Sequence, residues 1–136
     1  MPFTGPREDK EAIRELYATY SDASACEDPE AFVACFAENG EWNTHVFSRR
    51  GRAELRDQWD QLWVAFDKVG FLTEIGSIEV DGDRATGRCV AREIVRLKTG
   101  GLYKLIGKYR DELVKEDGRW VFARRDYEPI AEEVPA

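Results

Sequence analysis

The sequence predicts an α+β domain, in which three helices come first and an antiparallel meander of strands follows. Two observations carry this prediction. In the N-terminal half, apolar residues recur every three or four positions, as they do on one face of a helix. In the C-terminal half they tend to alternate with polar residues, and short glycine-containing turn segments divide the alternating runs. We expect the helices to cover one side of a curved sheet in a single domain of residues 1–136.

The predicted helices are marked by local start and stop signals. Apolar residues at helical spacing predict a first helix over residues 7–28. Asp28 then precedes a proline, which is typical of an N-cap residue before the first helical position. The second helix is predicted over residues 29–38 and ends at an Asn-Gly pair. A continuous apolar stripe predicts the third helix over residues 52–66.

The predicted strands have strand composition and lie between turn signals. A short strand is expected over residues 41–47, between the second and the third helix. The gaps between the later strands each contain glycine beside aspartate or threonine, which is typical of a hairpin turn. The four strands of the meander are expected over residues 71–80, 84–97, 102–115 and 119–129.

The composition excludes several classes of partner. The chain has 136 residues and a net charge of −7, which argues against binding to nucleic acid or to an anionic membrane. No run approaches the ~18 apolar residues of a membrane span. The three cysteines have no paired short spacing and are expected to be reduced thiols. Because the N-terminus also has no apolar segment typical of a secretory signal, we expect a cytoplasmic protein.

One carboxylate interrupts a small and apolar strand face in the stretch RATGRCVAREIVRLKTGG, residues 84–101. With a period of two, Glu93 shares its face with Cys89, Ala91 and Val95, while three arginines lie on the opposite face. If that face is buried, desolvation will raise the pKa of Glu93 toward neutrality. A carboxyl group with such a pKa is suited to general acid–base chemistry at neutral pH.

Two segments of the chain resemble the SnoaL-like branch of the nuclear-transport-factor-2-like superfamily. They are IEVDGDRATGR and DELVKEDGRWVFARR, each with the pattern strand, hairpin turn, strand, and the resemblance extends over about residues 8–128. It implies a cone-shaped fold, in which a strongly bent sheet wraps around a long N-terminal helix and an apolar cavity opens at one end. The family includes dehydratases, isomerases and polyketide cyclases of small hydrophobic molecules. The resemblance also implies a homodimer formed through the outer face of the sheet.

The catalytic dyad of the dehydratase-type members is missing from this chain. Those members use an aspartate late in the first helix and a histidine on the strand after the third helix. The matching positions here are Ala25 and Phe71. The family pattern turns Trp42 toward the cavity, so His45, which is the only histidine, is expected to face outward. One histidine and scattered carboxylates give no ligand cluster, so we predict neither a metal nor another cofactor.

The resemblance also implies an ion-pair partner for Glu93. It places Arg125 on the cavity side of the last strand, where a pair with Glu93 would lower the pKa of the carboxyl group and make it structural. Trp120 and Phe122 alternate against Arg125, which requires either a bulge in this strand or a second apolar layer. Without a register shift, Asp126 would face inward instead. The sequence leaves a free and a paired Glu93 as alternatives.

The remaining expected site residues are mostly aromatic. Tyr20 on the first helix and Tyr109 on the third strand of the meander would polarise a carbonyl or hydroxyl group of the ligand, and Arg125 would orient Glu93 or the ligand. Tyr103 shares the inward parity of Tyr109. The residues expected to contact the substrate are Ala25, Trp42, Phe71, Cys89, Ala91, Leu105 and Tyr127.

These residues predict a protein that binds a small, hydrophobic, oxygen-bearing molecule in an aromatic cavity. If it is an enzyme, the reaction is a cofactor-free proton transfer of the isomerase, dehydratase or cyclase type, with Glu93 as the acid or base. The alternative is a binding or assembly domain without catalysis, which the missing dyad favours.

Overall fold

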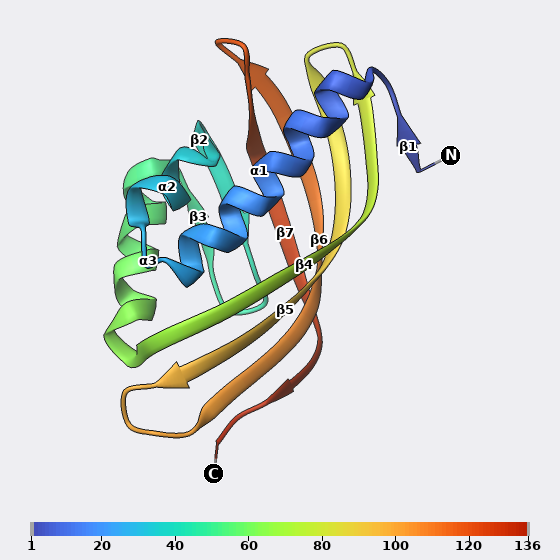
Figure 1. Ribbon diagram of the computed structural model, residues 1–136. Helices are drawn as coiled ribbons and strands as arrows, with labels where there is room; N and C mark the ends of the chain where they lie inside the picture. Colours follow the sequence, from blue (N-terminus) through green and yellow to red (C-terminus); the bar gives the residue numbers. More distant parts are fainter. Residues whose placement is uncertain (1, 136) are drawn as a thin grey trace.

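A computed structural model describes residues 2–135 as three helices against one mixed sheet (Figure 1). The helices are α1 (Arg7–Ala25), α2 (Pro29–Ala34) and α3 (Arg52–Ala65). The sheet has seven strands in the order β1-β4-β5-β6-β7-β2-β3. The strands are β1 (Phe3–Thr4), β2 (Phe36–Asn43), β3 (Ser48–Arg50), β4 (Phe66–Asp81), β5 (Arg84–Leu97), β6 (Leu102–Glu116) and β7 (Arg119–Glu133).

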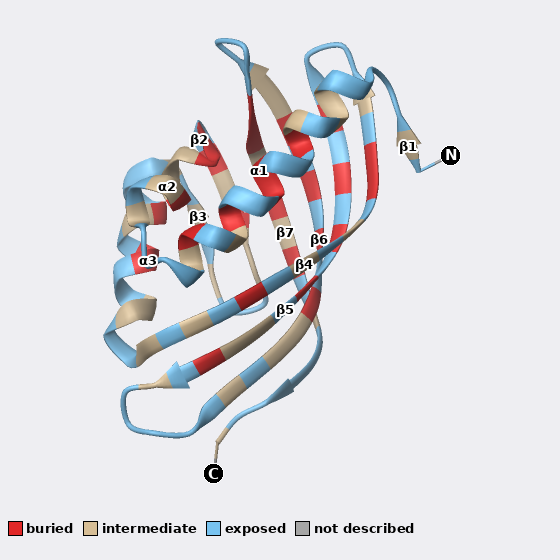
Figure 2. Cartoon of the chain, in the orientation of Figure 1, coloured by how far each residue is buried: buried red, intermediate tan, exposed pale blue. Residues whose placement is uncertain are grey.

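The architecture confirms the predicted α+β class with a curved and unclosed sheet. The four long strands β4 to β7 form the antiparallel meander, and β2 pairs in parallel with β7. Figure 1 shows α1 crossing the concave side of the sheet, with α2 and α3 beside β2 and β3. Figure 2 shows that buried positions recur along the strands of the meander, many of them where α1 crosses the sheet. None of the helices in this part of the chain has the length and apolarity needed to cross a membrane.

The second helix is shorter than predicted. Its start agrees, because the Asp28 side chain accepts a hydrogen bond from the backbone N–H of Ala31 at 3.1 Å, as an N-cap does. Its end lies at Ala34, so the predicted stop at residues 39 and 40 is wrong. The backbone leaves the helix because Phe36, which is fully buried, pairs with Phe122 of β7. Such a pairing between distant segments leaves no local signal in the sequence.

A bulge in β7 resolves the conflict in its register. Leu113 pairs with Phe122 and Glu112 pairs with Arg124, so Ala123 is the extra residue of β7. Trp120 and Phe122 precede the bulge and Arg125 follows it, and the one-residue shift places all three side chains in the buried interior. Asp126 therefore does not face inward.

Candidate functional site

A cavity of about 130 Å³ lies between the helices and the inner face of the sheet. Its wall is mostly aromatic, and α3 contributes the side chains of Trp59, Leu62 and Trp63 to it. The segment between β2 and β3 also contributes to the wall. The main lining residues are Tyr20, Ser24, Phe32, Trp42, His45, Phe47, Trp59, Leu62, Trp63, Phe71, Glu93, Tyr103, Leu105, Tyr109 and Tyr127.

Among residues 2–135, Glu93 is the one carboxylate that lines this cavity. Its neighbours across the sheet are Phe71 on β4 and Leu105 on β6, which are both apolar. Within the described chain its carboxyl group has no hydrogen-bond donor and no cation within ion-pair distance. Burial among these neighbours raises the pKa of Glu93 to about 7. The group is therefore partly protonated at neutral pH.

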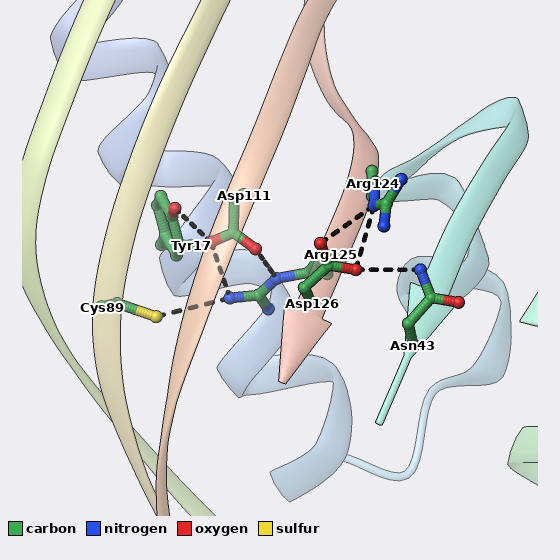
Figure 3. A network of polar contacts seen from close by, with 7 residues as sticks. All are labelled: Tyr17, Asn43, Cys89, Asp111, Arg124, Arg125 and Asp126. Carbon is green, nitrogen blue, oxygen red and sulfur yellow. Dashed lines mark hydrogen bonds and ion pairs between the residues drawn. The ribbon is translucent and has the colours of Figure 1, made fainter. Parts of the chain in front are cut away.

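Arg125 does not pair with Glu93, so the paired alternative is wrong. Its Nε donates to Asp111 Oδ1 at 2.8 Å and its Nη2 donates to Asp111 Oδ2 at 3.1 Å. The Tyr17 hydroxyl also donates to Asp111, and Arg125 Nη2 lies 3.4 Å from the sulfur of Cys89 (Figure 3). The reason is the register, because Asp111 lies directly opposite Arg125 in the β6–β7 ladder. Both charged side chains are fully buried.

The Arg125 guanidinium is stacked among aromatic rings below the cavity. Its central carbon lies 3.7 Å from the ring centre of Tyr109 and 4.4 Å from that of Tyr20. Both of these tyrosines also line the cavity, whereas Arg125 does not. Burial raises the pKa of both phenols, an effect that Arg125 reduces without cancelling. The two hydroxyl groups therefore stay protonated at neutral pH, as hydrogen-bond donors require.

Several expected contacts lie outside the cavity wall. Cys89 and Ala91 have the expected inward parity but are buried farther along β5. Next to them on β4, Thr73 is hydrogen-bonded to Ser21 of α1 at 2.9 Å, so α1 covers the sheet there. Ala25 is exposed at the end of α1 and lies outside the cavity, which Ser24 lines instead. The expected contacts that do line the cavity are Trp42, Phe71, Leu105 and Tyr127.

His45 is exposed, as expected, but it lies at the rim of the cavity instead of on the outer face of a strand. The expected strand ends at Asn43, and residues 44–47 form a tight loop. The Thr44 side chain holds this loop by accepting hydrogen bonds from the backbone N–H groups of Val46 and Phe47, at 3.1 and 3.2 Å. The His45 ring centre lies 6.2 Å from that of Tyr127.

Sequence reasoning missed Asp111 and Tyr17, which complete the buried network. Asp111 has the same parity on β6 as Tyr109, a signal that could have placed it inside the fold. Tyr17 shares the apolar side of α1 with Tyr20. No group of three or more histidine, cysteine or carboxylate side chains within residues 2–135 is arranged to hold a metal ion.

Comparison with known families identifies the fold. The sequence model of the SnoaL-like domain matches residues 6–126, which is most of the chain. The chain belongs to the SnoaL-like domain family. A search of curated proteins gave no match.

Several solved structures share the SnoaL-like fold of this chain. A variant of Rv3472, a Mycobacterium tuberculosis protein of unknown function, is 30% identical, with a TM-score of 0.82 over 91% of this chain and 77% of that one. A scytalone dehydratase-like protein of Novosphingobium aromaticivorans is 27% identical, with a TM-score of 0.85 over 94% and 90% of the two chains. A ketosteroid isomerase-like protein of Erwinia carotovora is 21% identical and shares the fold, with a TM-score of 0.81 over 93% and 99%.

Proposed function

We propose that this SnoaL-like domain binds a small hydrophobic molecule bearing a carbonyl or hydroxyl group and transfers a proton on it without a cofactor, with Glu93 as the acid and base. The observation that carries the proposal is the state of Glu93, which has no partner among residues 2–135 and has a pKa raised by burial to about 7. A group with a pKa near the working pH can both accept and return a proton.

Glu93 and the tyrosines of the cavity wall define the steps of the proposed reaction. The ionised Glu93 takes a proton from a carbon next to the ligand carbonyl, and the electron pair of that C–H bond moves toward the carbonyl oxygen. The hydroxyl groups of Tyr20 and Tyr109 donate hydrogen bonds to the oxygen as its negative charge grows. Glu93 then returns the proton to another carbon, which completes an isomerisation, or to a β-hydroxyl group that leaves as water, which completes a dehydration.

The related proteins support this type of chemistry only by their names. One solved neighbour is scytalone dehydratase-like and another is ketosteroid isomerase-like. In this chain, however, Ala25 and Phe71 stand at the positions of the aspartate and histidine expected from the family. The second candidate is therefore a SnoaL-like domain that binds its ligand without catalysis.

The first test is an NMR titration of the Glu93 carboxyl carbon, with Glu93→Gln to assign the signal. We expect a pKa of about 7. A value near the ordinary 4.5 would end the proposed acid–base role. Enolisable ketones and β-hydroxy carbonyl compounds are then screened for turnover. We expect Glu93→Gln to abolish turnover and Glu74→Gln, which changes an exposed carboxylate of β4, to preserve it. Binding without turnover by the unmodified protein would favour the second candidate.

We also propose that the protein is a cytoplasmic homodimer formed through the outer face of the sheet. Exposed apolar side chains on that face, at Leu72 and Val90, support the proposal. Analytical ultracentrifugation tests it directly, and we expect Leu72→Asp together with Val90→Asp to shift the species to a monomer. A wild-type monomer at all accessible concentrations would contradict it.

A further inference from the structure

Two polar atoms of the cavity-lining residues lack a hydrogen-bond partner among residues 2–135. They are the indole N–H of Trp42 and the hydroxyl group of Tyr127. Trp42 is 7% exposed and Tyr127 is 9% exposed. A buried polar group without a partner destabilises the protein, so such atoms in a binding site usually meet a ligand or water.

The two rings are held firmly in place. The ring of Trp42 packs edge-on against Phe32 and Phe47, with centroid distances of 5.2 and 4.8 Å. The Tyr127 side chain lies over Gly107 of β6, where an added Cβ atom would be only 2.2 Å from the hydroxyl oxygen. Both side chains line the cavity, but their polar atoms are covered by neighbouring atoms, so a ligand reaches them only when side chains of the wall shift as it binds.

The charges in the wall disfavour an anionic ligand. Arg125 is the nearest buried cation, but it lies behind Tyr109 and Tyr20, and Asp111 already neutralises it. His45 at the exposed rim is the one basic side chain in the described wall. A ligand carboxylate would therefore lose its hydration and gain no countercharge, and an ionised Glu93 would repel it.

The chemistry of the two groups defines the ligand further. An indole N–H can only donate, so the ligand atom opposite Trp42 must be an acceptor, whereas a phenol can donate or accept. The cavity volume of about 130 Å³ is close to the ~150 Å³ of an apolar cavity that holds benzene. We infer that the ligand is a neutral, single-ring molecule whose oxygen accepts a hydrogen bond from Trp42 and exchanges one with Tyr127. This inference rests on the proposed function only in that the cavity binds a small molecule.

The experiment uses three one-ring probes of similar size: benzyl alcohol, ethylbenzene and benzoate. Their binding is followed through the indole ¹H–¹⁵N signals of the four tryptophans, with Trp42→Phe to assign the signal of Trp42. At pH 8 we expect benzyl alcohol to bind and to move the Trp42 signal downfield, as a new hydrogen bond does. Ethylbenzene should leave that proton without an acceptor. Benzoate should bind at least roughly tenfold more weakly than benzyl alcohol, because no cation in the described wall meets it.

Two tyrosines of the wall provide a matched pair of variants. The Tyr103 hydroxyl already donates to Glu132 at 2.7 Å, whereas that of Tyr127 is unpartnered. We expect Tyr127→Phe to weaken benzyl alcohol roughly threefold to tenfold and to leave ethylbenzene unchanged, which corresponds to the loss of one neutral hydrogen bond. Tyr103→Phe should change neither affinity. The Tyr127 variant removes a single oxygen atom, so the test does not depend on the folding of the Trp42 variant.

Three outcomes would overturn the inference. They are benzoate binding as tightly as benzyl alcohol, an equal effect of the two tyrosine variants, and no binding of any probe. The last would overturn the single-ring class of ligand, whereas the proposed function is tested separately by the Glu93 titration and the turnover screen. If the probes follow the expected pattern but no ketone is turned over, the class of ligand stands and only proton transfer by Glu93 fails.

Discussion

Two carboxylates on the inner face of the sheet, Asp111 on β6 and Glu93 on β5, are in opposite electrostatic situations. Asp111 accepts two hydrogen bonds from Arg125 and one from Tyr17, beneath α1. Glu93 lies beyond the part of the sheet that α1 covers, in the cavity wall, between Phe71 and Leu105. Both lose hydration through burial, but only Asp111 gains a countercharge in return. The first is therefore suited to holding the structure together and the second to exchanging a proton.

A tyrosine accompanies each carboxylate and repeats the contrast. Tyr17 lies over Gly87 and Tyr127 lies over Gly107, and at both glycines an added Cβ atom would come within 2.5 Å of the phenol oxygen. The Tyr17 hydroxyl donates to Asp111, while the Tyr127 hydroxyl has no partner in the described chain. The same packing of a ring on a glycine thus completes a network in one region. In the other it leaves the hydroxyl group of a cavity-lining residue without a partner among residues 2–135.

The largest effect is expected from breaking the paired region. Asp111→Ala leaves Arg125 buried without its countercharge, so we expect a loss of about 3–5 kcal/mol in the free energy of unfolding. Urea denaturation followed by circular dichroism measures it. The double variant Asp111→Leu with Arg125→Met removes both charges, and we expect it to recover most of the loss. A loss below about 1 kcal/mol for Asp111→Ala would mean that the pair does not hold the interior together.

In the region around Glu93, removing the charge should increase the free energy of unfolding, and only at high pH. Burial raises the pKa of Glu93 from the ordinary 4.5 to about 7, so between these values the folded protein binds more protons than the unfolded chain. Stability is therefore lost as the pH rises through this window. We expect Glu93→Gln to be more stable than the unmodified protein at pH 8, by on the order of 2–3 kcal/mol, and the difference to vanish near pH 4.5.

Urea denaturation at pH 5, 6.5 and 8 measures this pH dependence. Glu74→Gln is the control, because Glu74 lies on the exposed face of β4 and should give curves that run parallel to those of the unmodified protein. A Glu93→Gln protein that is less stable at pH 8 would show that the carboxylate has a partner in solution.

Most of the fold could be predicted because its signals are local. The hairpin turns lie between the residues expected, and the predicted bounds of β5 agree with the structure. The short strands β1 and β3, of two and three residues, were missed because so few residues show no periodicity. The end of α2 was misplaced because it depends on the pairing of Phe36 with Phe122, far away in the sequence.

The sequence predicted which side chains of the site face inward, but not which of them form ion pairs or hydrogen bonds with each other. Alternation along β5 and β6 correctly turned Glu93, Leu105 and Tyr109 inward. It could not show which carboxylate lies opposite Arg125, because that depends on the β6–β7 register and on the bulge at Ala123. Parity also gives no position along a strand. Cys89 was therefore expected in the cavity although α1 covers that part of the sheet.

A smaller effect should separate a glycine beneath a cavity tyrosine from a glycine with free space. Gly107→Ala places a methyl group on the Tyr127 ring, and we expect a loss of about 1–3 kcal/mol, as for other overpacked interiors. Gly70→Ala in β4 is the control, since its added Cβ atom would meet nothing closer than 3.8 Å. We expect it to be neutral or slightly stabilising, because alanine loses less backbone freedom on folding. Equal losses for the two variants in thermal denaturation would contradict the tight contact at Gly107.

The smallest effect is expected from removing the Tyr127 hydroxyl group, and it distinguishes the two tyrosines. Tyr17→Phe removes a hydrogen bond to a charged acceptor, so we expect a loss of about 1.5–3 kcal/mol at the upper limit, and nearer 1 kcal/mol if Arg125 compensates. Tyr127→Phe removes a hydroxyl group without a partner in the described chain, so we expect a change within about 0.5 kcal/mol, or a slight stabilisation. Both variants keep the ring that packs on the glycine, so the difference between their urea midpoints isolates the hydroxyl group. If Tyr127→Phe proved as damaging as Tyr17→Phe, its hydroxyl group would have a structural partner and would not be free for a ligand. The two regions would then differ only in the carboxylates.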